Sequence, residues 1–107
     1  MAPFPKLFLL SLNIIVIFNK QEIFMELKQL EAFVAVVDYN SFSEAARHLF
    51  LTQPTVSAHV ASLEKELDTK LISRTTKKLH ITPQGYDLYD SAVSMLKIRD
   101  HILNEFI

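Results

Sequence analysis

Cysteine is absent from this chain of 107 residues, and glycine occurs only once, as Gly85. Without cysteine the chain can form neither a disulfide nor a cysteine-ligated zinc site, which suits a reducing compartment. A single glycine also excludes a P-loop and a GxGxxG turn, because both need several glycines close together. The 4 histidines are spread over separate segments without an HxxxH or HxH pair, so we expect no metal site and no cofactor. With no nucleophile elbow either, the sequence gives no support for an enzyme.

Excess charge of either sign is also missing, since the formal net charge is −1. DNA-binding domains usually carry a basic patch, so the distribution of the charges becomes the useful quantity. No acidic residue occurs between residues 45 and 63 or between residues 69 and 86, and the acids between these stretches are Glu64, Glu66 and Asp68. A polyanion could therefore approach both stretches without meeting carboxylates. Chance clustering in a small soluble domain would give the same pattern.

A long hydrophobic run is missing as well. The apolar part of the leader, residues 7–18, is shorter than the ~20 residues that cross a bilayer. A signal peptide would suit Lys6 and this run, but no small-x-small cleavage site follows. We expect residues 1–24 to be upstream sequence or an extension outside the fold, with Met25 as the working start and a cytoplasmic location. A membrane anchor and an additional helix or strand are the alternatives.

The pattern from Met25 onward predicts three helices. The first covers residues 26–39, and its helical spacing predicts a buried stripe of Leu27, Leu30, Phe33, Val34 and Val37. Ser41 and Glu44 have capping-box spacing and predict a second helix over residues 43–49. After a turn at residues 50–51, Thr52 caps a third helix and Pro54 fits its first turn. The stripe predicted to be buried on this helix comprises Val56, Val60, Leu63 and Leu67.

A basic hairpin and a long last helix follow. Residues 71–72 and 79–81 are short strand candidates joined by a loop that contains Lys77 and Lys78. Thr82 and Pro83 end the hairpin and start a helix that continues to about residue 104. Two short helices joined by a tight turn and followed by such a wing are the layout of a winged helix-turn-helix, which places one helix in the DNA major groove. The predicted fold is therefore mainly α, with a winged helix-turn-helix over residues 25–82 and a linker helix over residues 83–107.

The third helix and the wing carry the candidate DNA contacts. The exposed helix face has small neutral polar groups in place of charges, which suits close approach to bases and phosphates. Because a carboxamide can pair bidentately with adenine, Gln53 is the leading base reader, and the predicted base contacts are Gln53, Pro54 and Ser57. The predicted contacts with the DNA backbone are Thr52, Thr55, His59, Arg74, Lys77 and Lys78.

Each of these assignments has a structural alternative. Gln53 could be a helix-start residue only, and Ser57 an inert exposed serine. Lys77 and Lys78 could form a solvated turn. Arg74 could pair with a carboxylate, such as that of Glu64 or Asp68.

The last helix has two apolar faces. One comprises Tyr86, Tyr89, Val93, Leu96 and Leu103. The other comprises Leu88, Ala92, Met95, Ile102 and Phe106. One face can cover the domain, and we predict that the set beginning at Tyr86 pairs with the same helix of a second chain. A symmetric dimer implies an inverted-repeat operator. The alternative is one broad stripe that packs only on its own domain.

Four segments in this order closely resemble the N-terminal DNA-binding domain of LysR-type transcriptional regulators: LKQLEAFVAVVDYNSFSEAARHL, TQPTVSAHVASLEKEL, KLISRTTK and LHITPQG. The resemblance runs from Met25 to about Leu103 and implies sequence-specific binding of double-stranded DNA and regulation of transcription. This chain departs from the family at three positions. Asp68 replaces a usual glycine, Ile72 replaces a usual phenylalanine, and Ala58 stands where many members have a larger polar or basic residue.

The resemblance also implies what these residues do not include. Family members are longer and carry a C-terminal domain that senses a small molecule, so we expect no effector site in these 107 residues. The rival interpretations are a winged helix that binds proteins and a regulator tethered to a membrane through the leader.

Overall fold

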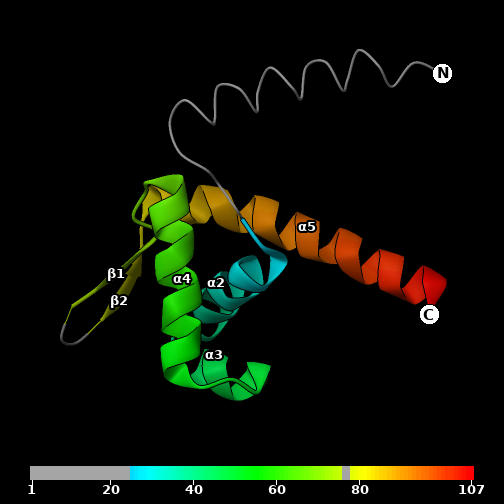
Figure 1. The fold of residues 1–107 in the computed structure, drawn as a ribbon. Helices are drawn as coiled ribbons and strands as arrows, with labels where there is room; N and C mark the ends of the chain where they lie inside the picture. Colours follow the sequence, from blue (N-terminus) through cyan, green and yellow to red (C-terminus); the bar gives the residue numbers. More distant parts are fainter. Residues whose placement is uncertain (1–24, 76–77) are drawn as a thin grey trace, which may run out of the picture.

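Four helices and one hairpin make up the part of the chain that the computed structural model describes, residues 25–75 and 78–107. The order is α2 (Leu27–Tyr39), α3 (Phe42–Leu49), α4 (Gln53–Leu67), β1 (Ile72–Arg74), β2 (Leu79–Ile81) and α5 (Pro83–Phe106) (Figure 1). The prediction of a mainly α winged helix-turn-helix with a long last helix is confirmed. The expectations for residues 1–24 and for Lys77 lie outside the described residues.

Helix α2 is the centre of the core, because α3, α4 and α5 all pack against it. Its buried residues include Leu30, Phe33 and Val36. Val34 and Val37 are half-buried against this core, as predicted, whereas the prediction for Leu27 was wrong, since Leu27 is 40% exposed. The buried face of α2 is wider than one stripe because neighbours lie on several of its sides, while Leu27, the first residue of the helix, is left partly uncovered.

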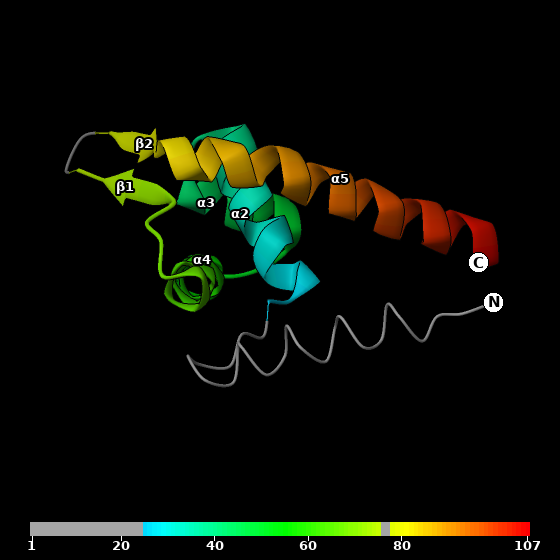
Figure 2. The same ribbon diagram turned by 90° about the horizontal axis from the view of Figure 1, so that it is seen from above.

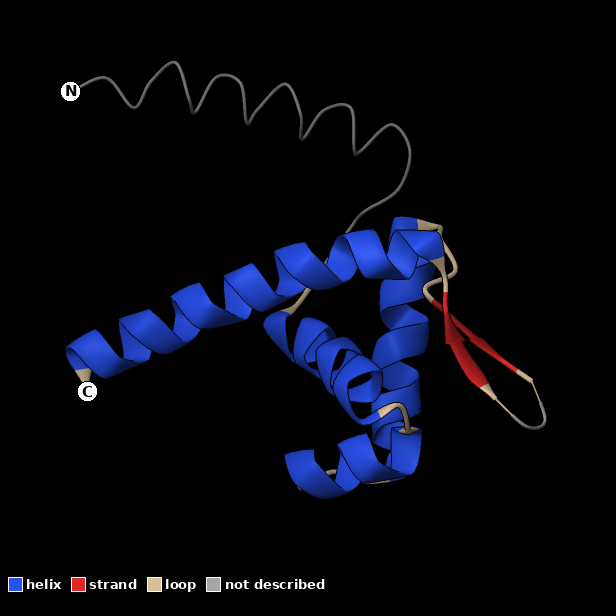
Figure 3. Ribbon diagram, turned by 180° about the vertical axis from the view of Figure 1, so that it is seen from behind, coloured by secondary structure: helices blue, strands red, loops and turns tan. Residues whose placement is uncertain are grey.

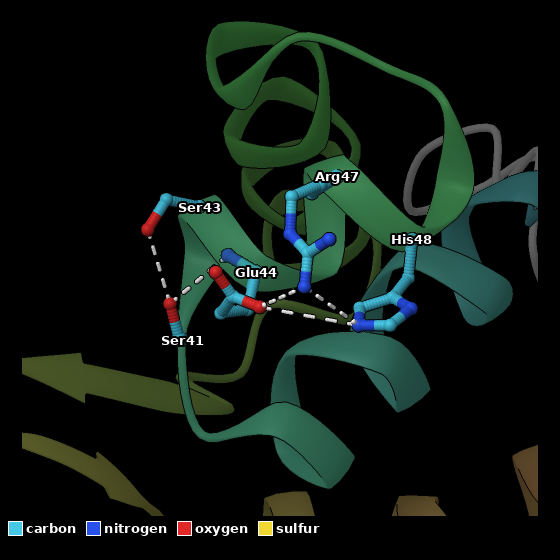
Figure 4. Close-up of polar contacts among 5 residues, drawn as sticks. All are labelled: Ser41, Ser43, Glu44, Arg47 and His48. Carbon is cyan, nitrogen blue, oxygen red and sulfur yellow. Dashed lines mark hydrogen bonds and ion pairs between the residues drawn. The ribbon is translucent and has the colours of Figure 1, made fainter.

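Local hydrogen bonds set the helix boundaries. The Ser41 hydroxyl accepts a hydrogen bond from the Glu44 backbone N–H at 3.1 Å and so caps α3. The reciprocal half of the predicted capping box is absent from the hydrogen bonds of the described residues, because Glu44 Oε1 accepts from Arg47 Nη2 at 2.8 Å instead (Figure 4). Phe50 ends α3 in the left-handed region with φ 58° and forms the predicted turn. The tight helix-turn-helix angle therefore begins at a residue with unusual backbone geometry.

The end of α4 leads into the wing. Asp68 ends α4 with φ 49°, which is the conformation that glycine adopts most easily, so the aspartate keeps the turn despite its side chain. Strands β1 and β2 are antiparallel, with Ile72 opposite Ile81. The predicted first strand was displaced, because β1 begins at Ile72 and extends to Arg74. This extension brings Arg74 into the pleated part of the wing.

The wing and α5 meet at a close backbone contact. The Thr82 hydroxyl donates to the Lys70 carbonyl at 2.6 Å and accepts from the Gly85 N–H at 3.0 Å, so one side chain joins the base of the wing to the first turn of α5. A Cβ at residue 85 would lie 2.4 Å from the Leu71 carbonyl oxygen. The single glycine of the chain therefore lies where α5 packs directly against the backbone of Leu71.

Helix α5 packs on the domain as far as Arg99, and its last turns project from the domain (Figures 1 and 2). Leu88 and Tyr89 pack against the core and Ala92 is fully buried. Further along, Arg99 Nη1 donates to Glu31 Oε2 on α2 at 3.1 Å. In the described residues, no helix is long and apolar enough to cross a membrane.

Candidate nucleic-acid interface

The N-terminal end of α4 is exposed and polar. Gln53 and Pro54 are the first two residues of the helix, and both are exposed. The Thr52 hydroxyl accepts from the Thr55 N–H at 3.3 Å and lies 2.8 Å from the Thr55 hydroxyl. Two hydroxyls that share one hydrogen bond use one proton between them, so the other proton is left to donate elsewhere. Together with the positive end of the helix dipole, this arrangement suits a phosphate.

The middle of α4 is closer to its neighbours. Ser57 and His59 are half-buried, whereas Ala58 is exposed. The opposite face of α4 is buried in the core, as predicted, through Val56, Val60 and Leu63. The structure therefore places Ser57 and His59 at the edges of the exposed face and Gln53 and Pro54 at its tip.

Arg74 reaches from the wing to α4. Its Nη2 donates to the Ser57 hydroxyl at 3.0 Å, and the guanidinium carbon lies 3.6 Å from the centre of the Phe42 ring (Arg74, Ser57 and Phe42 are called the wing–helix bridge below). Among the described residues Arg74 forms no ion pair with Glu64 or Asp68, which was the structural alternative. The bridge joins α3, α4 and β1 and was missed by the sequence reasoning, because Ser57 and Arg74 are 17 positions apart with no periodic pattern between them.

Glu64 binds backbone N–H groups at the start of the wing instead of Arg74. Its Oε2 accepts from the N–H groups of Leu71 and Ile72 at 2.8 and 3.1 Å, and its Oε1 lies 3.6 Å from Lys70 Nζ. The carboxylate thus binds the backbone at the start of the wing, and its charge is balanced by Lys70. A polyanion that approaches α4 and the wing therefore meets little uncompensated negative charge here.

Thr75 and Lys78, the described residues on either side of the wing loop, are both exposed. The Thr75 N–H donates to the Lys78 carbonyl at 2.9 Å, and the Lys78 N–H donates to the Thr75 hydroxyl at 3.1 Å. These two bonds close the loop and leave the Lys78 side chain exposed. Lys77, the other predicted wing contact, is outside the described residues.

A shallow pocket of about 270 Å³ lies where α4 meets the wing. Its lining includes Phe42, Ser57, Lys70, Ser73 and Arg74. The wing projects beside α4 (Figures 1 and 3), so the pocket joins the helix face and the hairpin into one continuous surface. The lining also includes the Glu64 carboxylate, which is paired with Lys70, so Arg74 leaves the pocket with a net positive charge that suits the backbone of a nucleic acid.

Helix α3 carries a compensated charge cluster beside this surface. The hydrogen bond from Arg47 lowers the pKa of Glu44 and raises the pKa of Arg47 itself. His48 Nε2 is 3.9 Å from Glu44 Oε1 (Figure 4). The His48 ring stacks on Tyr39 with ring centres 4.0 Å apart. The cluster therefore places the one acid of α3 next to a guanidinium instead of leaving it free to repel phosphates.

The five residues predicted for pairing lie on one stripe of α5 but differ in how far the domain covers them. Tyr89 donates to Asp38 on α2, and this hydrogen bond raises the pKa of Tyr89. Val93 and Leu96 are half-buried, whereas Tyr86 is 59% and Leu103 46% exposed. The exposed apolar side chains toward the C-terminal end of α5 are Met95, Ile98, Ile102, Leu103 and Phe106. Tyr89, one of the residues predicted for pairing, thus contacts α2. Met95, Ile102 and Phe106, which belong to the other predicted apolar face, are exposed.

Comparison with known proteins gives a consistent family. Residues 27–86 match the model of the bacterial regulatory helix-turn-helix protein, lysR family. This chain belongs to the lysR family. The family match spans α2 to the first turn of α5 and so includes all the residues predicted to contact DNA.

Individual relatives match the same part of the chain. BenM of Acinetobacter baylyi, an HTH-type transcriptional regulator, is 38% identical over 80 residues, which are 75% of this chain and 26% of BenM. The Bacillus subtilis protein YxjO, an uncharacterized HTH-type transcriptional regulator, is 40% identical over 74 residues, which are 69% of this chain and 25% of YxjO. The chain thus spans about a quarter of the length of these curated relatives. In a solved BenM_DBD/catB site 1 DNA complex, the BenM chain superposes with a TM-score of 0.72 at 37% identity, covering 76% of this chain and 91% of that one.

Proposed function

We propose that this lysR-family chain binds double-stranded DNA sequence-specifically and thereby regulates transcription in the cytoplasm. The observation that carries the proposal is the superposition of this fold, with its exposed polar start of α4 and its wing beside α4 (Figure 1), on a DNA-bound BenM domain. In the proposal α4 enters the major groove with its N-terminal end first, and the wing lies along the DNA backbone. No step of this function needs catalysis or a cofactor.

The contact residues take roles that follow from their chemistry. Gln53 offers a donor and an acceptor at the tip of α4 and would read adenine, while Pro54 would touch a thymine methyl group or a sugar. Ser57 would contact a base one turn further along the helix. The contacts proposed for the DNA backbone are Thr52, Thr55, His59, Lys77 and Lys78. Arg74, which the sequence also predicted as a backbone contact, donates to Ser57 in the free domain.

The projecting end of α5 supports a homodimer. Residues 88, 92 and 99 face α2, and Leu103 and Phe106 continue the same helical line beyond the domain, where they are 46% and 82% exposed. An apolar line that runs past the end of its own domain is typical of a surface that a second copy covers. We therefore propose pairing through this end of α5, with an inverted-repeat operator as its consequence.

Selection from a random duplex library with the 107-residue chain at low salt tests the proposal. The expected result is an enriched inverted repeat. Gln53→Ala should cost about 1–3 kcal/mol and relax the preference at one position of each half-site. Gln84→Ala is the matched control, because Gln84 is also an exposed glutamine in the first turn of a helix. Unchanged preference in Gln53→Ala would refute the assignment of Gln53.

The lysines of the wing predict a different signature. Lys77→Ala should weaken binding to all sequences alike and reduce the slope of log K against log salt by about one unit. The rival interpretations predict other results. A winged helix that binds a protein would show salt-insensitive binding to its partner and no enrichment of duplexes, and a membrane-tethered regulator would sediment with membranes on fractionation.

A further inference from the structure

The wing–helix bridge is built from three elements that are distant in sequence. Arg74 lies on β1, Ser57 on α4, and Phe42 is the first residue of α3. Phe42 is only 6% exposed, so its ring is a fixed platform for the guanidinium above it. The hydrogen bond to Ser57 then fixes the direction of the guanidinium. The side chain of Arg74 is therefore committed to contacts within the domain before any DNA arrives.

We propose that Arg74 is a positioning residue, which fixes the wing against α4 and turns the Ser57 hydroxyl so that Ser57 acts as a hydrogen-bond donor to DNA. The second half of this proposal rests on the proposed DNA binding, whereas the first half concerns the free domain. The assignment differs from a phosphate contact, in which Arg74 would act through its charge alone.

The donor character of Ser57 follows from hydrogen-bond chemistry. A guanidinium has only donors, so the Ser57 oxygen must be the acceptor in the bond from Arg74. The hydroxyl keeps its proton and one lone pair, and repulsion by the cation favours orientations in which the proton points away from Arg74 and can be donated to DNA. In the major groove a donor pairs with N7 or O6 of guanine, N7 of adenine or O4 of thymine, and it does not pair with the N4 amino group of cytosine. Ser57 should therefore select for an acceptor on the strand that it faces.

The chemistry of the bridge also requires arginine. A planar guanidinium can stack on an aromatic face and donate in its own plane at the same time, whereas the compact ammonium of lysine cannot do both from one position. Glu64, the acid among the pocket-lining residues, already accepts hydrogen bonds from the N–H groups of Leu71 and Ile72. Arg74 donates to the Ser57 hydroxyl and not to this carboxylate. Arg74→Lys becomes the decisive variant, because it keeps the charge and loses the geometry.

Hydrogen exchange in the free 107-residue chain tests the first half without DNA. The amides of β1 and β2 and of Thr75 should exchange about threefold to tenfold faster in Arg74→Ala, because an exposed interaction worth roughly one ordinary hydrogen bond no longer holds the wing. Arg74→Lys should exchange nearly as fast as Arg74→Ala. Lys78→Ala removes a neighbouring wing charge without touching the bridge, so its exchange should match the unaltered chain. Equal exchange in all four proteins would overturn the positioning role.

Duplex selection tests the second half. Arg74→Ala, Ser57→Ala and the double variant should lose preference at the same base position, and the double variant should be no worse at that position than Ser57→Ala. Arg74→Lys should show the same loss, although its salt slope stays that of the unaltered chain. If Arg74→Lys restores the preference, or if the two substitutions act additively, Arg74 is an independent charge contact and the proposal is wrong. If the unaltered chain enriches no duplex while exchange still responds to Arg74, the proposed DNA binding fails and the structural bridge stands.

Discussion

Gly85→Ala sets two effects of opposite sign against each other. Alanine favours a helix by about 1 kcal/mol over glycine, so propensity alone predicts a more stable protein. The new Cβ, however, would lie 2.4 Å from the Leu71 carbonyl oxygen and 2.8 Å from the Cγ2 atom of Ile81. The carbonyl is backbone and accepts hydrogen bonds from the N–H and the hydroxyl of Thr82 at 3.0 and 3.3 Å, so it cannot move without disturbing the cap of α5.

The balance favours destabilisation. Overpacking of this kind costs about 1–3 kcal/mol and occasionally more, and strain on a helix cap adds about 1 kcal/mol. After subtraction of the helix propensity, we expect Gly85→Ala to lower the free energy of unfolding by about 1–3 kcal/mol. This is a large share of the stability of a small domain.

Urea unfolding of the 107-residue chain, followed by circular dichroism at 25 °C, measures this change. The midpoint should fall while the m-value stays the same, because the surface exposed on unfolding is unchanged. Ser91→Ala is the matched control, since Ser91 is exposed on α5 and its substitution should add up to about 0.5 kcal/mol. A Gly85→Ala protein as stable as the unaltered chain, or more so, would refute the argument that the start of α5 has no room for a methyl group.

Three further substitutions test other contacts of the fold. Asp68→Gly should raise the free energy of unfolding by up to about 1 kcal/mol, because φ at this residue is 49° and glycine adopts that conformation without a clash. Glu64→Ala should lower it by about 2 kcal/mol, since two backbone N–H groups of the wing lose a charged acceptor. Tyr89→Phe should lower it by up to about 1 kcal/mol at pH 7, through loss of the hydrogen bond to Asp38. Because the pKa of Tyr89 is raised on folding, that stabilisation is complete below pH ~10 and is lost as the pH rises through the folded pKa.

The same urea titration checks all three, with the Tyr89 pair also measured at alkaline pH. Asp68→Asn is a control that keeps a side chain with a tolerance for positive φ. A destabilised Asp68→Gly would mean that flexibility of the unfolded chain outweighs the relief of strain. A Glu64→Ala protein of unchanged stability would remove the support for the role of Glu64 at the wing. If the unaltered chain and Tyr89→Phe lost stability equally above pH 10, the contact with Asp38 would not be the titrating interaction.

The candidate site was predictable where its residues act locally. Thr52, Gln53 and Pro54 follow one another at a helix start, and capping chemistry is a property of neighbours in sequence. The basic hairpin was recognisable from Lys77, Lys78 and the strand-like residues around them. The wing–helix bridge was not, because a contact between an arginine and a distant serine leaves no periodic signal.

The division of α5 into its two uses shows the same limit. Periodicity identified two apolar lines on this helix, and both are present in the structure. It could not show which residues cover α2, because adjacent lines on a helix differ by a small rotation. The hydrogen bond from Tyr89 to Asp38 and the burial of Ala92 fix that rotation.

The sequence by itself determined the order of the helices, the caps at Ser41 and Thr52, the presence of the wing and the family, since all of these depend on residues close together along the chain. Only the tertiary structure decided that Arg74 serves Ser57 and Phe42, that Glu64 holds the wing, and that Gly85 lies against the Leu71 carbonyl. These are contacts between separate elements, whose partners are chosen by packing direction and distance. Sequence patterns report which face of an element is apolar, whereas packing decides which atoms meet across it.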